Sequence, residues 1–240
     1  MSLLEARGIH KSFGALQALG GVDLCLERGE ILGVIGPNGS GKTTLFNCMT
    51  GILRPDSGRV VFGGRDITGW PTHRICRAGL VKTSQIVRPF LGMSVLENVL
   101  VGGLYGKGLL LKRARAQALE ILEQVGLAEA AAQPAGSITV AMRRRLELAR
   151  CLATGPQAIL LDENLAGLTP VEIAESLALL RSLNAQGLSL VVVEHVMQAV
   201  MGVSQRVMVL DYGQKIAEGP PAQVVADRRV IEAFLGEEYA

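Results

Sequence analysis

Short apolar runs alternate with segments of helical periodicity along most of the chain. The run Ile31–Ile35 is apolar apart from one glycine, and a glycine-rich stretch follows it at once. Three more apolar runs of strand length come later: Ala158–Leu161, Leu188–Val193 and Val207–Leu210. Such runs, without regular polar alternation, are typical of strands that are covered on both faces. The pattern therefore predicts an α/β fold.

The middle of the chain has the periodicity of helices. Between Lys112 and Val125, apolar residues recur at helical spacing with charged residues between them. The stretch from Met142 to Leu152 continues the pattern, so we predict a mostly helical region of about 70 residues between two strand-rich parts. Four glycines in this region predict a loose connection: Gly102, Gly103, Gly106 and Gly108.

Composition narrows the class of protein. The 240 residues suffice for one large or two small domains, and the 49% hydrophobic content excludes a disordered chain. The net charge of +2 argues against nucleic-acid binding through bulk charge. The mean hydropathy of +0.33 invites a membrane interpretation, but no apolar run approaches the roughly 18 to 20 residues of a spanning helix. The start, MSLLEARGIHK, has no apolar stretch of signal-peptide length, so we expect no secretion.

Cysteine and glycine add two further expectations. The four cysteines are far apart and form no C-x-x-C pair, which favours buried free thiols in a reducing compartment over metal or redox sites. The 29 glycines are about 12% of the chain, above the usual ~7%. Some of them are therefore expected where the backbone turns sharply or approaches a ligand closely.

The glycine-rich stretch after Ile31–Ile35 has the pattern G-x-x-x-x-G-K-[ST]. Glycines let successive backbone N–H groups curl around phosphate oxygens, and the helix that follows presents its positive N-terminus. Lys42 is expected to reach the β- and γ-phosphates, and the Thr43 hydroxyl to ligate Mg²⁺. The candidate phosphate-binding residues are Gly36, Pro37, Asn38, Gly39, Ser40, Gly41, Lys42, Thr43 and Thr44.

Polar residues with candidate catalytic or ligand-binding roles follow two of the later strands. Asp162, at the end of AILLDE, suits a Mg²⁺ that Thr43 holds, and Glu163 can polarise an attacking water. His195 follows another apolar strand, and such strand ends lie on the ligand side of a parallel sheet, so His195 is a candidate γ-phosphate contact.

These elements, in this order and spacing, resemble the nucleotide-binding subunits of ABC transporters over essentially the whole chain. The resemblance implies a P-loop NTPase core with a mostly parallel sheet, an N-terminal antiparallel β part and an inserted α-helical subdomain. It implies one ABC ATPase domain, in which residues 1–84 and 156–240 form the core and about 85–155 the helical subdomain. ATP and Mg²⁺ are the implied ligands.

The same resemblance implies roles for individual residues. Phe13, in HKSFGALQAL, corresponds to the aromatic residue that stacks on adenine. Gln85, in VKTSQ, corresponds to the glutamine that contacts Mg²⁺ and the attacking water and senses the membrane partner. The implied catalytic set is Glu163, His195 and Gln85, and the implied metal ligands are Thr43, Gln85 and Asp162.

Longer stretches narrow the resemblance to the ATP-binding subunits of branched-chain amino-acid importers. They include FNCMTGILRPDSGRVVFGGRDITG, RRLELARCL, AGLTP and VIEAFLG. This implies a peripheral subunit on the cytoplasmic face of the inner or plasma membrane, with transmembrane permease subunits docking at about residues 86–104. A second ATPase subunit and, indirectly, a substrate-binding protein are the other implied partners. The transported substrate follows from resemblance only, because this subunit does not touch it.

One motif departs from the family pattern. The signature Leu-Ser-Gly-Gly-Gln, which contacts the ATP of the opposite subunit, corresponds here to Ile138-Thr139-Val140-Ala141-Met142. If the two glycine positions need φ > 0, a Cβ there costs roughly 1–2 kcal/mol. Because the signature acts in trans, this chain's own site is intact while its partner's is impaired, so we expect a heterodimer in preference to a homodimer. Two milder departures are Asn164, where proline usually follows the glutamate, and Thr169 in the D-loop.

Two runs of basic residues lie in the predicted helical region. We interpret both as solvated or interface helix faces, without nucleic-acid binding: Arg143–Arg145, and the group Lys112, Arg113 and Arg115.

The altered signature prompts one alternative function, a regulatory ATP-binding subunit with little hydrolysis. A soluble ABC ATPase of DNA repair or translation is the other, but 240 residues leave no room for its paired cassettes or coiled coils.

Overall fold

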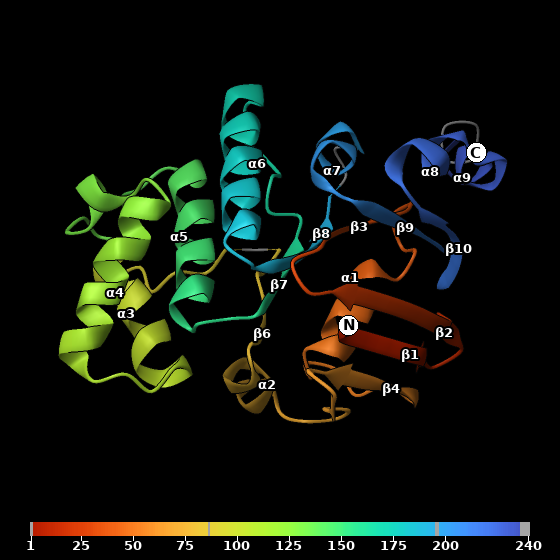
Figure 1. Cartoon of the computed structure of the whole chain (residues 1–240), viewed down its shortest axis with the longest axis horizontal. Coiled ribbons are helices and arrows are strands. Elements are labelled where there is room, and N and C mark those ends of the chain that lie inside the picture. Colours follow the sequence, from red (N-terminus) through yellow and green to blue (C-terminus); the bar gives the residue numbers. More distant parts are fainter. Residues whose placement is uncertain (1, 86, 195–196, 236–240) are drawn as a thin grey trace.

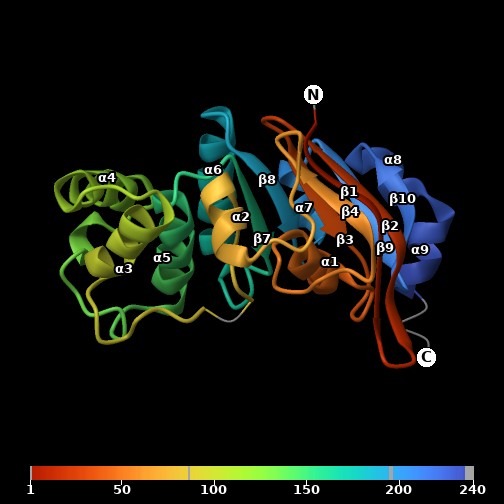
Figure 2. The ribbon, with the colours of Figure 1, turned by 90° about the horizontal axis from the view of Figure 1, so that it is seen from below.

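The structure is a computed structural model that describes residues 2–85, 87–194 and 197–235. A helical part lies at one end of the long axis, and two sheets occupy the rest of the molecule (Figure 1). The view from below shows the same order, with the helical part set apart from both sheets (Figure 2). Within the described residues, no helix is both long and apolar enough to cross a membrane.

A six-stranded sheet forms the centre of the fold. Its strands, in spatial order, are β10 (Gln214–Gly219), β9 (Arg206–Asp211), β3 (Ile31–Ile35), β8 (Ser189–Val193), β7 (Ala158–Asp162) and β6 (Leu80–Lys82). All neighbours are parallel except β10 and β9, which pair antiparallel. Every residue of β3, β7 and β8 is buried, which confirms the strands predicted from apolar runs. The parallel direction brings the carboxyl ends of these three strands to one edge.

A four-stranded antiparallel sheet covers one side of this core. Its spatial order is β2 (Leu16–Glu27), β1 (Ser2–Phe13), β4 (Ser57–Phe62) and β5 (Arg65–Asp66). Helix α1 (Lys42–Met49) lies between the two sheets (Figure 1). Phe46 of α1 is fully buried in one hydrophobic cluster with Leu4 of β1 and Val191 of β8. The N-terminal antiparallel part implied by the resemblance is thereby confirmed.

Helices cover the remaining surfaces of the parallel sheet. Leu180 and Leu183 of α6 (Pro170–Ala185) pack against β7 and β8, and α7 (Met197–Val203) packs beside β3. Helices α8 (Pro221–Ala226) and α9 (Arg228–Leu235) pack at the β9–β10 edge, and α2 (Thr72–Ala78) contacts β6.

The helical part runs between β6 and β7 in sequence and has a hydrophobic core of its own. Its elements are α3 (Val95–Val101), the π-helical turn η1 (Gly102–Gly106), α4 (Leu111–Gln124), the 3₁₀ turn η2 (Ala128–Ala130) and α5 (Val140–Ala153). Leu122 of α4 and Leu146 of α5 are fully buried in this core. The predicted helices at residues 112–125 and 142–152 correspond to α4 and α5.

The prediction of a loose connection at residues 102–108 is wrong for its first part. Residues 102–106 continue α3 as the turn η1, which packs closely against α5. A Cβ on Gly102 would lie 2.6 Å from the carbonyl oxygen of Arg150, and one on Gly106 would lie 2.8 Å from the methyl group of Thr154. These glycines are needed because η1 and the end of α5 approach each other closely. They therefore belong to a tightly packed contact and not to the loose connection that the sequence predicted.

Candidate functional site

Two glycines of the loop between β3 and α1 lie directly against the backbone of neighbouring segments. A Cβ on Gly36 would lie 2.0 Å from the carbonyl oxygen of Leu210, at the end of β9. Gly41 has φ +99°, and a Cβ there would lie 2.6 Å from the carbonyl oxygen of Ala18. Backbone approaches this close exclude every side chain at both positions. Asn38 and Gly39, by contrast, are exposed at the crest of the loop.

The ammonium group of Lys42 is enclosed by its own loop. Its Nζ donates to the carbonyl oxygens of Gly36 at 2.7 Å and Pro37 at 2.8 Å, and it lies 3.4 Å from the hydroxyl of Ser40. Lys42 is buried, with 6% of its surface exposed. A cation held by neutral carbonyls in a loop that precedes a helix N-terminus suits a bound anion such as a phosphate.

Asp162 ends β7 directly beneath this loop. Its side chain is fully buried, and the Thr43 hydroxyl lies 3.5 Å from its Oδ1. Its backbone N–H donates to the Thr83 hydroxyl at 3.1 Å. Hydroxyl and carboxylate oxygens are the ligands that Mg²⁺ prefers. The structure therefore brings together the two predicted ligands Thr43 and Asp162.

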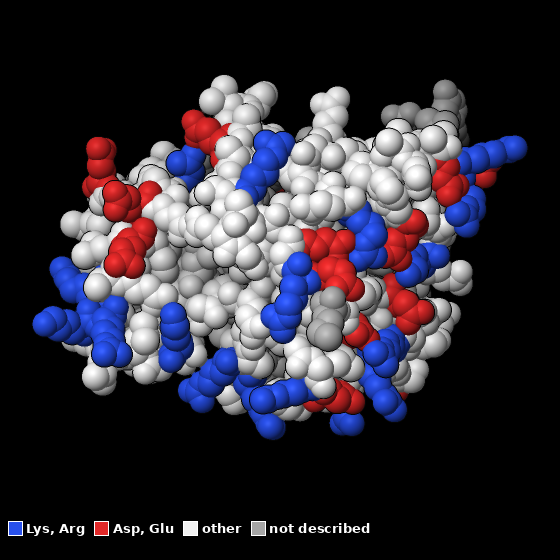
Figure 3. Space-filling model, viewed as in Figure 1, with Lys and Arg blue, Asp and Glu red and all other residues white. Residues whose placement is uncertain are grey.

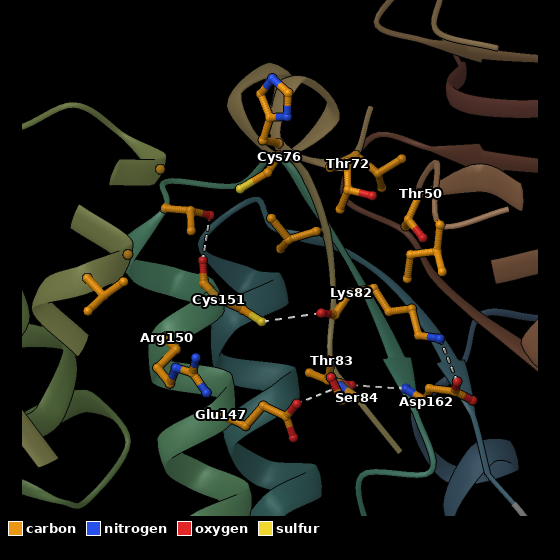
Figure 4. Close-up of a pocket in the computed structure, with 18 of the residues that line it drawn as sticks. Thr50, Thr72, Cys76, Lys82, Thr83, Ser84, Glu147, Arg150, Cys151 and Asp162 are labelled. Carbon is orange, nitrogen blue, oxygen red and sulfur yellow. Dashed lines mark hydrogen bonds and ion pairs between the residues drawn. The ribbon is translucent and has the colours of Figure 1, made fainter. Parts of the chain in front are cut away.

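Lys82 adds a cation to this group that the sequence did not indicate. Its Nζ lies 3.0 Å from Oδ2 of Asp162 and donates to Oδ1 of Asn47 at 2.8 Å. Figure 4 shows the ion pair at the edge of a cavity, with Thr83 beside it. Because Asp162 is buried, Lys82 stabilises a charge that would otherwise lie uncompensated in the interior. The sequence feature that could have indicated Lys82 is its position at the end of β6, three residues before Gln85.

Gln85 and Glu163 are in contact. The side-chain amide of Gln85 donates to Oε2 of Glu163 at 2.6 Å, although the two residues are 78 positions apart. Glu163 has φ +51°, a left-handed conformation that is uncommon for a residue with a side chain. Its N–H donates to the carbonyl of Val193 at 2.9 Å, and Arg144 donates to the carbonyl of Gln85 at 3.0 Å. Strained backbone of this kind is concentrated at functional sites.

Two residues follow β8, Glu194 and His195. His195 lies outside the described residues. Glu194, which precedes it, is 5% exposed and accepts a hydrogen bond of 2.7 Å from the N–H of Leu165. Burial raises the pKa of Glu194 to about 7, the Leu165 N–H lowers it and the nearby Glu163 carboxylate raises it further. The sequence had assigned no role to Glu194.

The loop after Glu163 has an unusual polar residue. Asn164 is 7% exposed, its side-chain Oδ1 has no hydrogen-bond partner, and its backbone N–H bonds the Glu194 carboxylate. Proline at this position would have no N–H to donate. Thr169, later in the loop, caps α6 through a reciprocal pair of hydrogen bonds with Glu172.

Phe13 ends β1 and is 48% exposed, at the turn that joins β1 to β2. The Lys11 ammonium lies 5.7 Å from the centre of its ring. An aromatic face left open to solvent can stack on a planar base, as the family resemblance implies.

The segment that corresponds to the family signature begins a helix. Thr139 is the N-cap of α5, and its hydroxyl accepts a hydrogen bond of 3.3 Å from the N–H of Met142. Val140 and Ala141 are helical, and Val140 is 58% exposed. The expected strain from φ > 0 at these two positions is therefore absent, because a helical backbone accommodates a Cβ. What remains is a branched apolar side chain at the exposed N-terminus of α5.

The three consecutive arginines of α5 are half-buried and bonded to the protein, which differs from a solvated face. Arg143 donates to the carbonyl of Gly136 at 2.7 Å, Arg144 to that of Gln85, and Arg145 pairs with Glu175. Since helical positions one apart point in different directions, the three side chains join α5 to three separate segments.

A cavity of about 900 Å³ opens between the parallel sheet and the helical part (Figure 4). Its lining includes Gln85 and the buried Asp162, together with Thr72, Tyr105 and Arg150. Glu147, also on the lining, accepts a hydrogen bond of 2.6 Å from the N–H of Ser84, and burial raises its pKa. The cavity thus reaches from the surface to the residues beside the phosphate loop.

The cysteines are free thiols, as predicted, although only Cys48 and Cys151 are buried. Burial raises the pKa of Cys48 to about 11 and that of Cys151 to about 12, so both are protonated at neutral pH. Among the described residues, no three His, Cys, Asp or Glu side chains form a group that could hold a metal.

Comparison with known proteins finds two matching family models and relatives that cover nearly the whole chain. A family model described as ABC transporter matches residues 19–166, and one described as branched-chain amino acid ATP-binding cassette transporter matches residues 214–240. The chain is 39% identical to the high-affinity branched-chain amino acid transport ATP-binding protein BraF of Pseudomonas aeruginosa, over 98% of both chains. It is 41% identical to LivG of Escherichia coli, a protein of the same description, over the same share of both chains.

Solved structures agree with this match. The ADP conformation of an ATP-binding cassette from an ABC transporter superimposes with a TM-score of 0.89 and is 32% identical, over 98% of this chain and 99% of that one. A nucleotide-free cassette of the same description superimposes equally well.

Proposed function

The chain belongs to the ATP-binding subunits of ABC transporters, and from this premise we propose that it powers an importer of branched-chain or other hydrophobic amino acids by hydrolysing ATP. The observation that carries the proposal is the meeting of the segments that follow three strands at one edge of the sheet. The loop after β3 leads to Lys42 at the start of α1, and the segment after β6 contributes Gln85. The end of β7 contributes Asp162 and Glu163.

The described residues suit ATP with Mg²⁺. The loop at residues 36–44 offers backbone N–H groups and the Lys42 ammonium to the phosphates, and the exposed ring of Phe13 offers a face to adenine. Oδ2 of Asp162 is buried and accepts no hydrogen bond, so this oxygen has capacity for a cation beyond its ion pair with Lys82. Thr43, Asp162 and Gln85 are the residues that would hold Mg²⁺. When bound, Mg²⁺ neutralises charge on the β- and γ-phosphates.

Glu163 is the proposed general base. It would accept the proton of the attacking water, and the Gln85 amide, 2.6 Å from its Oε2, would orient both the carboxylate and the water. The left-handed backbone at Glu163 and the bond from its N–H to Val193 fix where the carboxylate points. Lys42 would exchange its carbonyl partners for phosphate oxygens as charge develops on the leaving group. His195 is proposed to contact the γ-phosphate.

The amino-acid substrate is inferred from the relatives. BraF and LivG are described as branched-chain amino acid transport proteins, and both match this chain from end to end. The match at residues 214–240 to a branched-chain amino acid cassette family adds a second region. This subunit contributes the energy of hydrolysis, and its permease partners would select the substrate.

The cavity between the sheet and the helical part is the proposed docking place of the permease. It is lined by apolar and cationic side chains, including Tyr105, Arg77 and Arg150, and it ends at Gln85. A permease segment seated there would contact the same residue that orients Glu163. The Arg144 bond to the carbonyl of Gln85 would carry movement of α5 to this residue. This docking would place the subunit on the cytoplasmic face of the membrane.

A second ATPase subunit is proposed to complete the site. The signature of an ABC subunit acts on the ATP of its partner. Here Val140 presents an exposed branched side chain where the family has glycine. This chain's own site would be completed by an intact signature from a different subunit, and the partner's ATP would face the altered segment at residues 138–142.

Reconstitution tests the proposal. The chain is purified with its permease subunits, its partner ATPase and the binding protein, and uptake of labelled leucine into proteoliposomes is measured with and without ATP. We expect ATP-dependent uptake that Lys42→Ala abolishes and that the surface control Lys215→Ala retains. Hydrolysis without uptake of any hydrophobic amino acid would contradict the substrate. Failure to co-purify with membrane subunits would favour a soluble ATPase.

A further inference from the structure

A patch on the helical part combines exposed leucines with unpaired cations. It consists of Lys107, Leu110, Leu111, Lys112, Arg113 and Arg115, at and before the start of α4. Leu110 is 78% exposed and Leu111 is 63% exposed. Within the described residues, none of the four cations forms a salt bridge. Figure 3 shows Lys and Arg gathered over this end of the helical part, at the lower left.

The backbone of this segment is ordered, so the patch has a definite shape. The N–H of Lys107 donates to the carbonyl of Gly102 at 3.3 Å, and that of Leu109 donates to the carbonyl of Gly103 at 3.0 Å. Leu109 packs against the core of the helical part. Anchored in this way, the chain turns its next two leucines outward, although the partly buried Leu109 directly precedes them.

The cations do not serve the stability of α4. Three of them lie in its first turns, where the helix end is itself positive and acidic residues are favourable. That turn contains no acidic residue, and the N-cap Leu110 makes no side-chain hydrogen bond to the helix. The acidic residues of α4, Glu120 and Glu123, lie in its second half, so the three cations at its start have no acidic neighbour one turn further along the helix. An external anion therefore explains the arrangement better than folding does.

We propose that this patch binds the surface of an anionic phospholipid bilayer. Cations attract the phosphate headgroups, and exposed leucines beside them insert at the boundary of headgroups and acyl chains. A nucleic acid would use the cations but not the leucines. The patch also continues from the cavity, since Tyr105, which is 72% exposed, lines the cavity and lies two residues before Lys107.

The orientation of the patch toward the membrane rests on the proposed function. With a permease segment in the cavity, the side that carries Tyr105 faces the bilayer, and the patch lies beside the permease over lipid. Lipid contact there would hold the helical part against the membrane while the cassettes open and close.

Flotation of the isolated full chain with vesicles tests the proposal. Vesicles of phosphatidylethanolamine with about 30% phosphatidylglycerol are compared with pure phosphatidylcholine. We expect binding to the anionic vesicles only, and release as salt rises from about 0.05 to about 0.5 M. The variant Lys112→Gln/Arg113→Gln/Arg115→Gln should bind about 100-fold more weakly, from roughly fivefold per cation.

A control variant removes the same charge elsewhere. Arg7, Arg228 and Arg229 have side chains that are 62%, 90% and 67% exposed and lie outside the patch. Changing these three to Gln should leave vesicle binding within about threefold, because binding depends on local charge. An equal loss in both triple variants would reduce the effect to net charge and contradict the proposal.

A third variant separates lipid insertion from charge. Leu110→Ser/Leu111→Ser keeps all cations and places a hydroxyl at the N-cap, where serine favours the helix. We expect about a tenfold loss of vesicle binding and no loss of stability. Unchanged binding, or equal binding of the wild type to a DNA oligonucleotide, would overturn the lipid assignment. If the wild-type chain binds ATP but does not bind anionic vesicles, this proposal alone is contradicted. If it binds the vesicles but does not hydrolyse ATP, only the proposed function is contradicted.

Discussion

The side-chain amide of Gln85 donates a hydrogen bond of 2.6 Å to the carboxylate of Glu163. This contact joins the segment after β6 to the residue that follows β7, and Gln85 also lines the cavity that the permease is proposed to occupy. A segment bound in that cavity would therefore displace or fix the residue that contacts the proposed general base.

Gln85→Ala should slow hydrolysis while leaving ATP binding nearly unchanged. The substitution removes the donor to Glu163 but none of the phosphate-binding groups at residues 36–44. We expect turnover by the assembled transporter to fall about 10- to 100-fold, with the dissociation constant for ATP within about threefold. Steady-state hydrolysis and equilibrium nucleotide binding measure the two quantities. A large loss of binding with normal turnover would show that Gln85 acts on ATP affinity and not on the base.

Lys82→Met should destabilise the free protein and be rescued by Mg²⁺ with ATP. Without Lys82, the only contact left to the fully buried Asp162 carboxylate within the described residues is the distant one with Thr43. Removing one partner of a buried ion pair costs about 3–5 kcal/mol. Thermal unfolding should show this loss, and ATP with Mg²⁺ should restore more stability than ATP with EDTA. Lys215→Met, which removes an exposed pair with Glu218, serves as the control and should change stability little.

Much of the fold follows from local patterns, because apolar runs and helical periodicity record burial directly. The β3, β7, β8 and β9 strands, α4 and α5 were predicted from such patterns. A phosphate loop could be predicted because its pattern lies within nine consecutive residues, 36–44. Residues 102–106 were misjudged because glycine is required both by loose turns and by closely packed helices, and only the facing Arg150 backbone distinguishes the two.

Contacts between distant segments could not be predicted from the residues alone. Lys82 and Asp162 are 80 positions apart, and nothing in the sequence pairs them before the parallel order of β6 and β7 is known. Glu194 could have been noticed in the sequence as an acidic residue at the end of an apolar strand. Its hydrogen-bond partners at residues 164–165, however, lie in the loop that follows a different strand, β7. The strain expected at Val140 and Ala141 was wrong because the local pattern did not show that α5 already begins there.

Glu194→Gln should flatten the decline of stability with rising pH. The folded pKa of Glu194, about 7, lies above its ordinary value of 4.5. The folded state therefore binds more protons between these values, so this contribution to stability is full below about pH 4.5 and is lost as pH rises through about 7. The difference of about 2.5 pH units sets an upper limit of about 3 kcal/mol. Denaturant unfolding from pH 5 to 8 measures it, and parallel curves for both proteins would contradict the assignment.

The altered signature should make the two ATP sites unequal. The isolated chain should hydrolyse ATP slowly and without cooperativity, and a partner with an intact signature should raise turnover. Changing Val140→Gly, Ala141→Gly and Met142→Gln together should then accelerate the second site, at a cost of at most about 1.5 kcal/mol of helix stability from the two glycines. Stopped-flow phosphate release measures each combination. Robust, cooperative hydrolysis by the isolated wild-type chain would remove the basis for a heterodimer.

The most direct measurement is the comparison of ATP binding and hydrolysis by the assembled transporter with wild-type chain and with Glu163→Gln. The change keeps the shape and the possible hydrogen bond to Gln85 but removes the base, while the phosphate loop and Asp162 stay intact. The account predicts that turnover at this site falls at least about 100-fold and that the ATP dissociation constant stays within about threefold. Hydrolysis at the normal rate by the Glu163→Gln site would contradict it, because another group would then have to activate the water.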